Sequence, residues 1–231
     1  SSSPPLTGCT FTNNAAAYGA GMYNGAGSSP TLANCTFTGN SNLDQFGSGG
    51  GMYNDGSSPT LTGCTFTGNS ARFGDGGGMY NSIGVNGEGE EGSSPTLTDC
   101  TFTNNSAAEG GGMWNYLGTP TLTDCTFAGN SVTGFAGKGG GMWNYQSSPT
   151  LTDCAFTSNS TLGQYGYGGG MYNEESSSPA LTGCTFSSNS SDYQGGGMWN
   201  YEGSEPTLEN CTFTGNSAGS GGGGMYNDES S

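Results

Sequence analysis

The chain has 231 residues, of which 47 are glycine, 18 are acidic, 2 are basic and none is histidine, so its formal net charge is −16. Such acidity argues against nucleic acid or an anionic membrane as a partner, because only Arg72 and Lys138 could neutralise phosphate. Leu, Ile, Val and Phe together supply about 11% of the residues, a share that predicts disorder in an aperiodic chain of this charge. No stretch approaches the roughly 18 apolar residues of a membrane span. The chain starts at Ser1 without a signal sequence, which favours a processed or excised segment.

A repeat of about 29 residues predicts an ordered fold in spite of that composition. Each unit begins with Ser-Pro-Thr-Leu-Thr, continues through Cys-Thr-Phe-Thr-x-Asn-Ser into a variable stretch, and ends with Gly-Gly-Gly-Met-Tyr/Trp-Asn. Its Cys, Phe, Asn and Met recur eight times without a gap, so a few apolar residues can stack into one continuous narrow core. The approximate repeats are 1–27, 28–56, 57–92, 93–118, 119–146, 147–176, 177–203 and 204–231, and together they form a single solenoid domain.

Three short strands are predicted in each unit, in the order Thr-Leu-Thr, Cys-Thr-Phe-Thr and Met-aromatic-Asn. The first two alternate as strands do, with Leu and Phe inward and Thr outward, but the odd step from Leu32 to Cys35 requires a bend between them. The longest connection, from Ser82 to Ser94, contains a run of glutamates and is expected to protrude. The pattern predicts an all-β parallel β-solenoid of eight coils, with three strands per coil and each coil hydrogen-bonded to the next at about 4.8 Å.

A paired motif connects the chain to a known family. Phe-x-x-Asn recurs at Phe11–Asn14, Phe37–Asn40, Phe66–Asn69, Phe102–Asn105, Phe127–Asn130, Phe156–Asn159, Phe186–Asn189 and Phe213–Asn216, and its partner is Gly-Gly-Gly-Met, loosened to Gly19-Ala20-Gly21-Met22 in the first repeat. Over its whole length the chain resembles the repeats of chlamydial polymorphic outer-membrane proteins, which join Phe-x-x-Asn to Gly-Gly-Ala-Ile. The resemblance implies a right-handed parallel β-helix on a bacterial surface, often an adhesive autotransporter passenger. Met in place of Ile and the Ser-Pro-Thr-Leu-Thr segment are more similar to large surface proteins of environmental bacteria.

One cysteine per repeat is predicted to form an inward column of thiols that pack as small apolar groups. The column comprises Cys9, Cys35, Cys64, Cys100, Cys125, Cys154, Cys184 and Cys211. Disulfides between neighbouring coils are the alternative, favoured by the even count and an oxidising exterior, although in-register parallel strands hold the Cβ atoms slightly too far apart. A Cys-based metal site is disfavoured because the chain has neither Cys-x-x-Cys nor His.

Two asparagine columns are predicted to form amide ladders, in which each side chain bonds its copy in the next coil. The first, from Phe-x-x-Asn, is Asn14, Asn40, Asn69, Asn105, Asn130, Asn159, Asn189 and Asn216. The second, from Met-aromatic-Asn, is Asn24, Asn54, Asn81, Asn115, Asn144, Asn173, Asn200 and Asn227. Ligand contact is the alternative reading of both. The glycines before Met are expected to supply positive φ angles at a corner, and a phosphate cradle is disfavoured because no Lys or helix follows them.

The residue after each Met should point outward and form an aromatic column along the solenoid. The column is Tyr23, Tyr53, Tyr80, Trp114, Trp143, Tyr172, Trp199 and Tyr226, with Tyr116, Tyr145 and Tyr201 beside the three tryptophans. Contiguous exposed aromatics are typical of an interface. The sequence leaves open whether the column packs against a neighbouring chain, packs under the protein's own loops, or stacks on carbohydrate.

Outward threonines recur as Thr-x-Thr on two faces, as in Thr60/Thr62, Thr96/Thr98, Thr121/Thr123 and Thr150/Thr152, and again in Thr65/Thr67 and Thr101/Thr103. These arrays are similar to those of solenoid ice-binding proteins, and the alternative is that Thr simply suits an exposed strand. Asp99, Asp124 and Asp153 occupy one position in successive coils. They are expected to be solvated carboxylates at a turn, with bound Ca²⁺ as the alternative and no other cofactor predicted.

No catalytic residue is predicted. Without His there is no Ser-His-Asp arrangement, the acidic residues are scattered, and a polyuronate lyase would need more cations than Arg72 and Lys138. The uniform repeat favours an extracellular or cell-surface structural protein. Neither end differs from an internal junction, so we expect head-to-tail stacking with itself, and lateral contact as well, into a filament or surface stalk. The alternatives are an autotransporter-type adhesin or glycan-binding module, and an ice-binding protein. No nucleic-acid binding or membrane insertion is expected.

Overall fold

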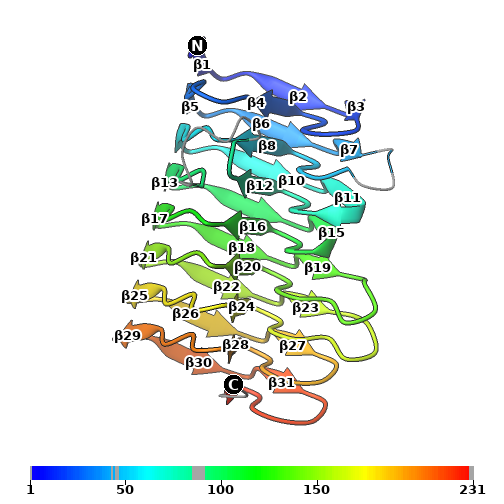
Figure 1. Ribbon diagram of the computed structural model, residues 1–231, viewed down its shortest axis with the longest axis vertical. Helices are drawn as coiled ribbons and strands as arrows, with labels where there is room; N and C mark the ends of the chain where they lie inside the picture. The colour runs from blue at the N-terminus through cyan, green and yellow to red at the C-terminus, as the bar shows by residue number, and fades with distance from the viewer. Residues whose placement is uncertain (1, 43, 45–46, 85–91, 229–231) are drawn as a thin grey trace.

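In the residues that the computed structural model describes, all regular structure is β, arranged as four parallel sheets of eight strands that run the length of the molecule (Figure 1). The structure describes residues 2–42, 44, 47–84 and 92–228. The connection expected to protrude between Ser82 and Ser94 therefore lies mostly outside the described residues. No helix of the described part is long and apolar enough to cross a membrane.

Every repeat contributes one strand to each sheet. Sheet A contains β1 (Pro5–Thr7), β5 (Thr31–Ala33), β9 (Thr60–Thr62), β13 (Thr96–Thr98), β17 (Thr121–Thr123), β21 (Thr150–Thr152), β25 (Ala180–Thr182) and β29 (Thr207–Glu209). Sheet B contains β2 (Thr10–Thr12), β6 (Thr36–Thr38), β10 (Thr65–Thr67), β14 (Thr101–Thr103), β18 (Thr126–Ala128), β22 (Ala155–Thr157), β26 (Thr185–Ser187) and β30 (Thr212–Thr214). Sheet C contains β3 (Ala15–Ala16), β7 (Ser41–Asn42), β11 (Ser70–Asp75), β15 (Ser106–Glu109), β19 (Ser131–Val132), β23 (Ser160–Thr161), β27 (Ser190–Ser191) and β31 (Ser217–Ala218). Sheet D contains β4 (Met22–Asn24), β8 (Met52–Asp55), β12 (Met79–Ser82), β16 (Met113–Tyr116), β20 (Met142–Tyr145), β24 (Met171–Glu174), β28 (Met198–Tyr201) and β32 (Met225–Asp228).

The prediction of three strands per coil is wrong, because the start of each variable stretch forms a fourth. These sheet C strands are as short as two residues, too short for an alternating pattern to be seen in the sequence. Their backbone is nevertheless paired, as where Ser70 N donates to Asn40 O at 2.9 Å. Their second residue points into the coil, so Ala71 and Val132 are fully buried.

Corners between sheets are made by residues in the left-handed region. Between sheets A and B the turn residue is Gly, Asn or Asp, including Asn34 at φ 52° and Asp99 at φ 53°. These are the residue types that adopt this conformation at low cost. The predicted bend between Leu32 and Cys35 is therefore real, and Asn34 makes it.

The glycine triad before each Met makes another corner, and close packing explains why its first and third positions are Gly in all eight repeats. Its first glycine has positive φ, for example φ 68° at Gly49. A Cβ on the third, Gly51, would lie 2.5 Å from the carbonyl oxygen of Gly78 in the next coil and 2.9 Å from the Phe66 ring. The glycines thus serve both the turn and the close approach of successive coils.

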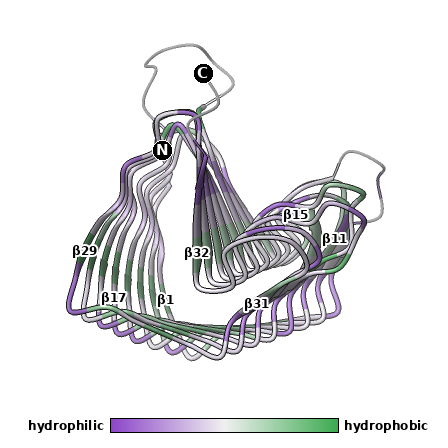
Figure 2. Ribbon diagram, turned by 90° about the horizontal axis from the view of Figure 1, so that it is seen from below, coloured by the Kyte–Doolittle hydropathy of each residue, from purple (hydrophilic) through white to green (hydrophobic). Residues whose placement is uncertain are grey.

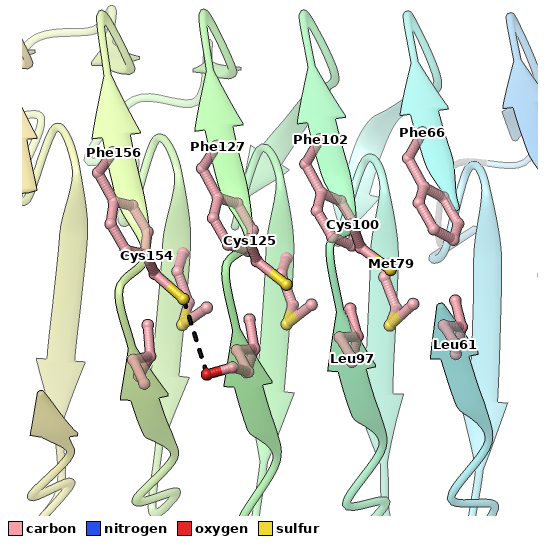
Figure 3. Close-up of a cluster of buried hydrophobic side chains, with 14 of the residues drawn as sticks. Leu61, Phe66, Met79, Leu97, Cys100, Phe102, Cys125, Phe127, Cys154 and Phe156 are labelled. Carbon is pink, nitrogen blue, oxygen red and sulfur yellow. Dashed lines mark hydrogen bonds between the residues drawn. The ribbon is translucent and has the colours of Figure 1, made fainter. Parts of the chain in front are cut away.

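The core lies inside the coil and consists of Leu, Cys, Phe and Met columns (Figure 3). Phenylalanine rings of successive coils stack with centroids 4.6–4.8 Å apart and interplanar angles of 2–6°. In the interior coils these side chains have at most 1% of their surface exposed. The strict period therefore compensates for the small apolar content, because each large side chain packs against its own copy.

A second layer covers the outer side of sheet D. Seen end-on, sheet D (β32) lies between sheet A (β29 to β1) on one side and, on the other, the sheet C strands β15 and β11 with the loops that follow sheet C (Figure 2). The variable stretch of each coil thus folds back before the glycine triad begins the next sheet D strand. A separate cluster of buried aromatic residues fills this second layer.

Candidate functional site

The cysteine column lies in the core, and all eight cysteines are unbonded thiols. Cys154, for example, donates to the carbonyl oxygen of Leu122 in the preceding coil at 3.7 Å (Figure 3). A hydrogen bond with the Cys125 thiol, together with burial, raises the pKa of Cys100 to about 12. A thiol held protonated in this way is a poor nucleophile and a poor metal ligand. The column therefore packs like small apolar residues.

The Phe-x-x-Asn column forms a continuous series of hydrogen bonds in the core. In the interior, Asn105 Nδ2 donates to Asn130 Oδ1 at 3.0 Å and to the Phe66 carbonyl oxygen at 2.9 Å, while its backbone N donates to the same Asn130 oxygen at 3.0 Å. The Met-aromatic-Asn column makes a simpler series with Nδ2–Oδ1 distances of 2.7–2.8 Å. Interior members of both columns are at most 2% exposed, so they are occupied by the fold itself rather than available to a ligand.

The three tryptophans do not form the exposed surface that was one reading of the sequence. Trp114, Trp143 and Trp199 are 7%, 6% and 5% exposed. Tyr167, from a returning loop, stacks on Trp199 with centroids 4.3 Å apart and an interplanar angle of 15°. Packing under the protein's own loops is therefore the arrangement found, and flat carbohydrate stacking on these indoles is wrong because their faces are covered.

The tyrosines that follow the tryptophans lie at the margin of this layer. Tyr116, Tyr145 and Tyr201 are partly exposed, and each contacts the tryptophan two residues before it at 5.1–6.1 Å between centroids. The three indole N–H groups have no hydrogen-bond partner among the described residues. Tyr23, in the first coil, is half exposed and donates to Asp55 Oδ2 at 2.7 Å.

A small group of charged side chains, which sequence reasoning missed, lies in the second layer. Lys138 Nζ is 2.9 Å from Glu174 Oε2, and it stands 5.0 Å above the Trp143 ring centroid and 5.4 Å above that of Tyr172. Asp75 and Glu109 are register partners in adjacent coils. Together they place three carboxylates and one ammonium group between sheet D and the returning segments.

The two carboxylates of the returning segments, Asp75 and Glu109, are partly buried. Burial raises the pKa of Asp75 to about 6. Burial and the nearby charge of Asp75 raise the pKa of Glu109 to about 7, against the opposing effect of Lys138. Near neutral pH these groups therefore carry a proton part of the time, and the pair-wise repulsion between them is reduced.

A positional signal for this group was present in the sequence. Asp75, Glu109 and Lys138 each directly precede the glycine triad of their coil, as do Tyr167 and Gln194, and Glu174 directly follows Met-aromatic-Asn. The prediction treated the acidic residues as scattered because insertions of different lengths precede them. Alignment on the glycine triad, rather than on Cys, brings them into one column.

Threonines occupy outward positions of sheets A and B in the register that the sequence predicted. Thr96 pairs with Thr121 and Thr98 with Thr123 on sheet A, while Thr65 pairs with Thr101 on sheet B. Asp99, Asp124 and Asp153 are the left-handed corner residues between the two sheets. Within the described residues, no group of three or more His, Cys, Asp or Glu side chains could hold a metal ion. The three aspartates thus take the left-handed conformation that this corner requires.

Comparison with known proteins agrees with this architecture. The sequence model described as the right-handed beta helix region matches residues 1–136 and 83–231, which together span the chain. No curated protein gives a significant match. The four parallel sheets and these matches confirm the predicted fold class of a right-handed parallel β-helix. The chain belongs to the right-handed beta helix family.

Proposed function

We propose that this chain is an extracellular structural module of a bacterial surface protein, and that it is not an enzyme. The observation that carries the proposal is the unbroken stacking of all four sheets from the first repeat to the last, with a register shift in sheet C between Ala71 and Asp75. Such an array gives length and stiffness from nearest-neighbour contacts alone. Its acidic surface keeps the module soluble and apart from anionic surfaces.

The partly buried charges of the second layer favour a structural role over catalysis. A glycosidase needs two carboxylates on opposite sides of a substrate groove. Asp75 and Glu109 instead lie in one column, in register, with the Lys138–Glu174 pair near them. The Lys138 ammonium is paired with Glu174 and lies over the Trp143 and Tyr172 rings. These contacts suit a residue that joins the returning segment to sheet D.

Head-to-tail stacking is the self-contact that the end coils favour. Residues 1–27 contain no charged side chain. The last coil carries a groove of about 710 Å³ whose lining includes Glu202, Glu205, Leu208 and Met225. A neutral coil placed on this acidic end avoids like-charge repulsion, whereas two acidic ends repel. We propose that the first coil of a second copy fills this groove and continues the four sheets.

A single backbone donor tests this contact. In every interior coil the amide equivalent to that of Thr10 donates to the preceding Cys carbonyl, as Thr36 N does to Cys9 O at 2.8 Å. In a stack, Thr10 N of the second copy would donate to Cys211 O of the first. The 231-residue protein is expected to form filaments in electron micrographs and concentration-dependent assemblies by light scattering. Thr10→Pro should stay monomeric, because proline lacks the donor yet is tolerated on an edge strand.

Thr10→Ala is the matched control, since it keeps the amide and should assemble like the parent. If the unmodified protein is monomeric at every concentration, head-to-tail stacking is wrong. Equal assembly by Thr10→Pro would do the same for the proposed register.

The adhesin alternative depended on an exposed surface of tryptophans, which the described part of the structure does not have. Glycan stacking required exposed indoles, and the tryptophans lie under the returning loops. A host-binding role would have to use the partly exposed tyrosines Tyr116, Tyr145 and Tyr201. The resemblance to chlamydial surface proteins supports surface display rather than any one ligand.

Ice binding is a second candidate function, and one observation favours it. Thr-x-Thr pairs from successive coils lie in register on two sheets, which gives regular arrays of hydroxyl and methyl groups. A regular array of this kind suits a partner that is itself periodic. Thermal hysteresis of the purified protein is the direct measurement of this function.

A further inference from the structure

The two threonine arrays differ in what they offer to solvent. We define face A as Thr60, Thr62, Thr96, Thr98, Thr121, Thr123, Thr150 and Thr152, the outward residues of β9, β13, β17 and β21. The first residue of each pair is exposed, as is Thr62, and the other second residues are partly exposed. In the same four coils, the outward threonines of the sheet B strands β10, β14, β18 and β22 are only partly exposed. Face A is therefore the more open of the two arrays.

Hydroxyl groups on face A also make fewer hydrogen bonds within the protein than those on sheet B. On sheet B, Thr65 Oγ1 donates to Thr36 Oγ1 at 3.3 Å, and Thr157 and Ser187 share a hydrogen bond at 3.1 Å. Within the described part of the chain, no face A hydroxyl makes a hydrogen bond to protein. Every such hydroxyl can thus both donate to and accept from water.

Charge is kept off this face although the chain carries a net charge of −16. The outward positions of sheet A hold Pro, Thr and Ala from β1 to β25, and the first charged one is Glu209 in β29. The aspartates Asp99, Asp124 and Asp153 lie one residue beyond, at the left-handed corner. Water next to face A is therefore oriented by hydroxyls and methyls rather than by a charged group on the array.

The chemistry of face A excludes most classes of partner. A protein partner is typically anchored by Trp, Tyr or Arg, and face A has none. Phosphate groups need Lys or Arg, and no basic residue lies on sheet A. Eight identical weak contacts add up only when a partner engages all of them at once, which requires a partner with its own regular repeat.

We propose that face A is the ice-binding surface of this protein, an inference that rests on the second candidate function above. Coils fix the spacing along the stack, as the Phe centroids 4.6–4.8 Å apart indicate. Threonine is β-branched and stiff at χ1, so its hydroxyl and methyl are already ordered before contact. A pre-ordered, uncharged array loses little entropy when it meets the ordered water of an ice surface.

A matched pair of double variants tests the assignment. Thr96→Lys with Thr121→Lys alters two register partners of face A. Thr101→Lys with Thr126→Lys alters the register partners of sheet B in the same two coils. The face A variant is expected to lose thermal hysteresis and ice-recrystallisation inhibition, while the sheet B variant keeps both. Circular dichroism melting of each variant verifies that the fold is retained.

The possible failures are distinguishable. If the parent protein neither shifts the freezing point nor inhibits recrystallisation, the ice-binding function itself is wrong. If the parent is active but the sheet B variant loses activity and the face A variant retains it, the function stands and the assignment to face A is wrong. Equal loss in both folded variants also contradicts the assignment, because charge would then act from either face.

Discussion

In the interior coils, the asparagine of the Phe-x-x-Asn motif satisfies polar groups of both neighbouring coils. Asn130 accepts from the backbone N and from Nδ2 of Asn105, and it donates to the Phe102 carbonyl oxygen and to Asn159 Oδ1. Since Asn130 is fully buried, water cannot replace these partners. The side chain is therefore a structural residue whose loss affects three coils.

Replacement of Asn130 by Ala should lower the free energy of unfolding by at least about 3 kcal/mol, because several buried partners each lose a hydrogen bond. Urea unfolding followed by circular dichroism measures this change. Thr133→Ala, at an exposed position in the same coil, is the control and should shift stability by no more than about 0.5 kcal/mol. Equal effects of the two changes would contradict the ladder as a source of stability.

At the scale of elements, the returning segments and sheet D form a layer held by aromatic stacking and one ion pair. The Lys138–Glu174 pair links the segment before one glycine triad to β24. Asp75 and Glu109 lie on the same returning column but have raised pKa values, because burial disfavours their charged forms. The layer is therefore sensitive to pH where the main core is not.

We expect stability to fall as the pH rises from about 4 to about 7. Unfolded Asp and Glu titrate near 3.9 and 4.3, whereas burial raises the folded pKa of Asp75 to about 6 and that of Glu109 to about 7. In that window the folded protein binds more protons than the unfolded chain, so the free energy of unfolding decreases with pH and levels off above it. Thermal melting across this range measures the trend.

Comparison of Glu109→Gln with Glu205→Gln separates the effect of the raised Glu109 pKa from the effect of the change in net charge. The variant should show a smaller fall in Tm between pH 4 and pH 8 and a higher Tm than the parent at the upper end. Glu205→Gln removes the same charge at an exposed site and should leave the fall in Tm as it is in the parent. An unchanged pH profile in Glu109→Gln would show that this carboxyl is solvated.

At the scale of the whole molecule, a net charge of −16 acts on a long, narrow solenoid. Like charges recur at short spacing wherever one acidic position is kept in successive coils, as at Asp99, Asp124 and Asp153. Mutual repulsion destabilises a compact state of such charge. Salt should therefore stabilise this protein more than it stabilises a neutral one.

We predict that Tm rises with NaCl as the Debye length shortens from about 30 Å at 0.01 M to about 3 Å at 1 M. Calcium at matched ionic strength should add nothing beyond this screening, because the three corner aspartates serve as left-handed turn residues. An additional rise in Tm with Ca²⁺ over Mg²⁺ would instead establish a calcium site. Asp124→Asn, which keeps a residue suited to positive φ, would locate it.

The sequence alone determined the columns of the solenoid. Leu, Cys, Phe, Met and both Asn columns recur at a fixed phase, and parallel in-register stacking follows from that period because each side chain meets its own copy. The bend after Leu32 was predictable for the same reason, since two inward residues an odd number apart cannot lie on one straight strand.

Only the tertiary structure decided what covers the outer side of sheet D. The returning segments differ in length and composition from coil to coil, so the period contains no information on how they fold back. Their fold buries Trp143, creates the fourth sheet, and brings Lys138 to Glu174, which is 36 residues away. An outward position on a strand is exposed only if nothing lies over it, and that depends on contacts between segments rather than on local alternation.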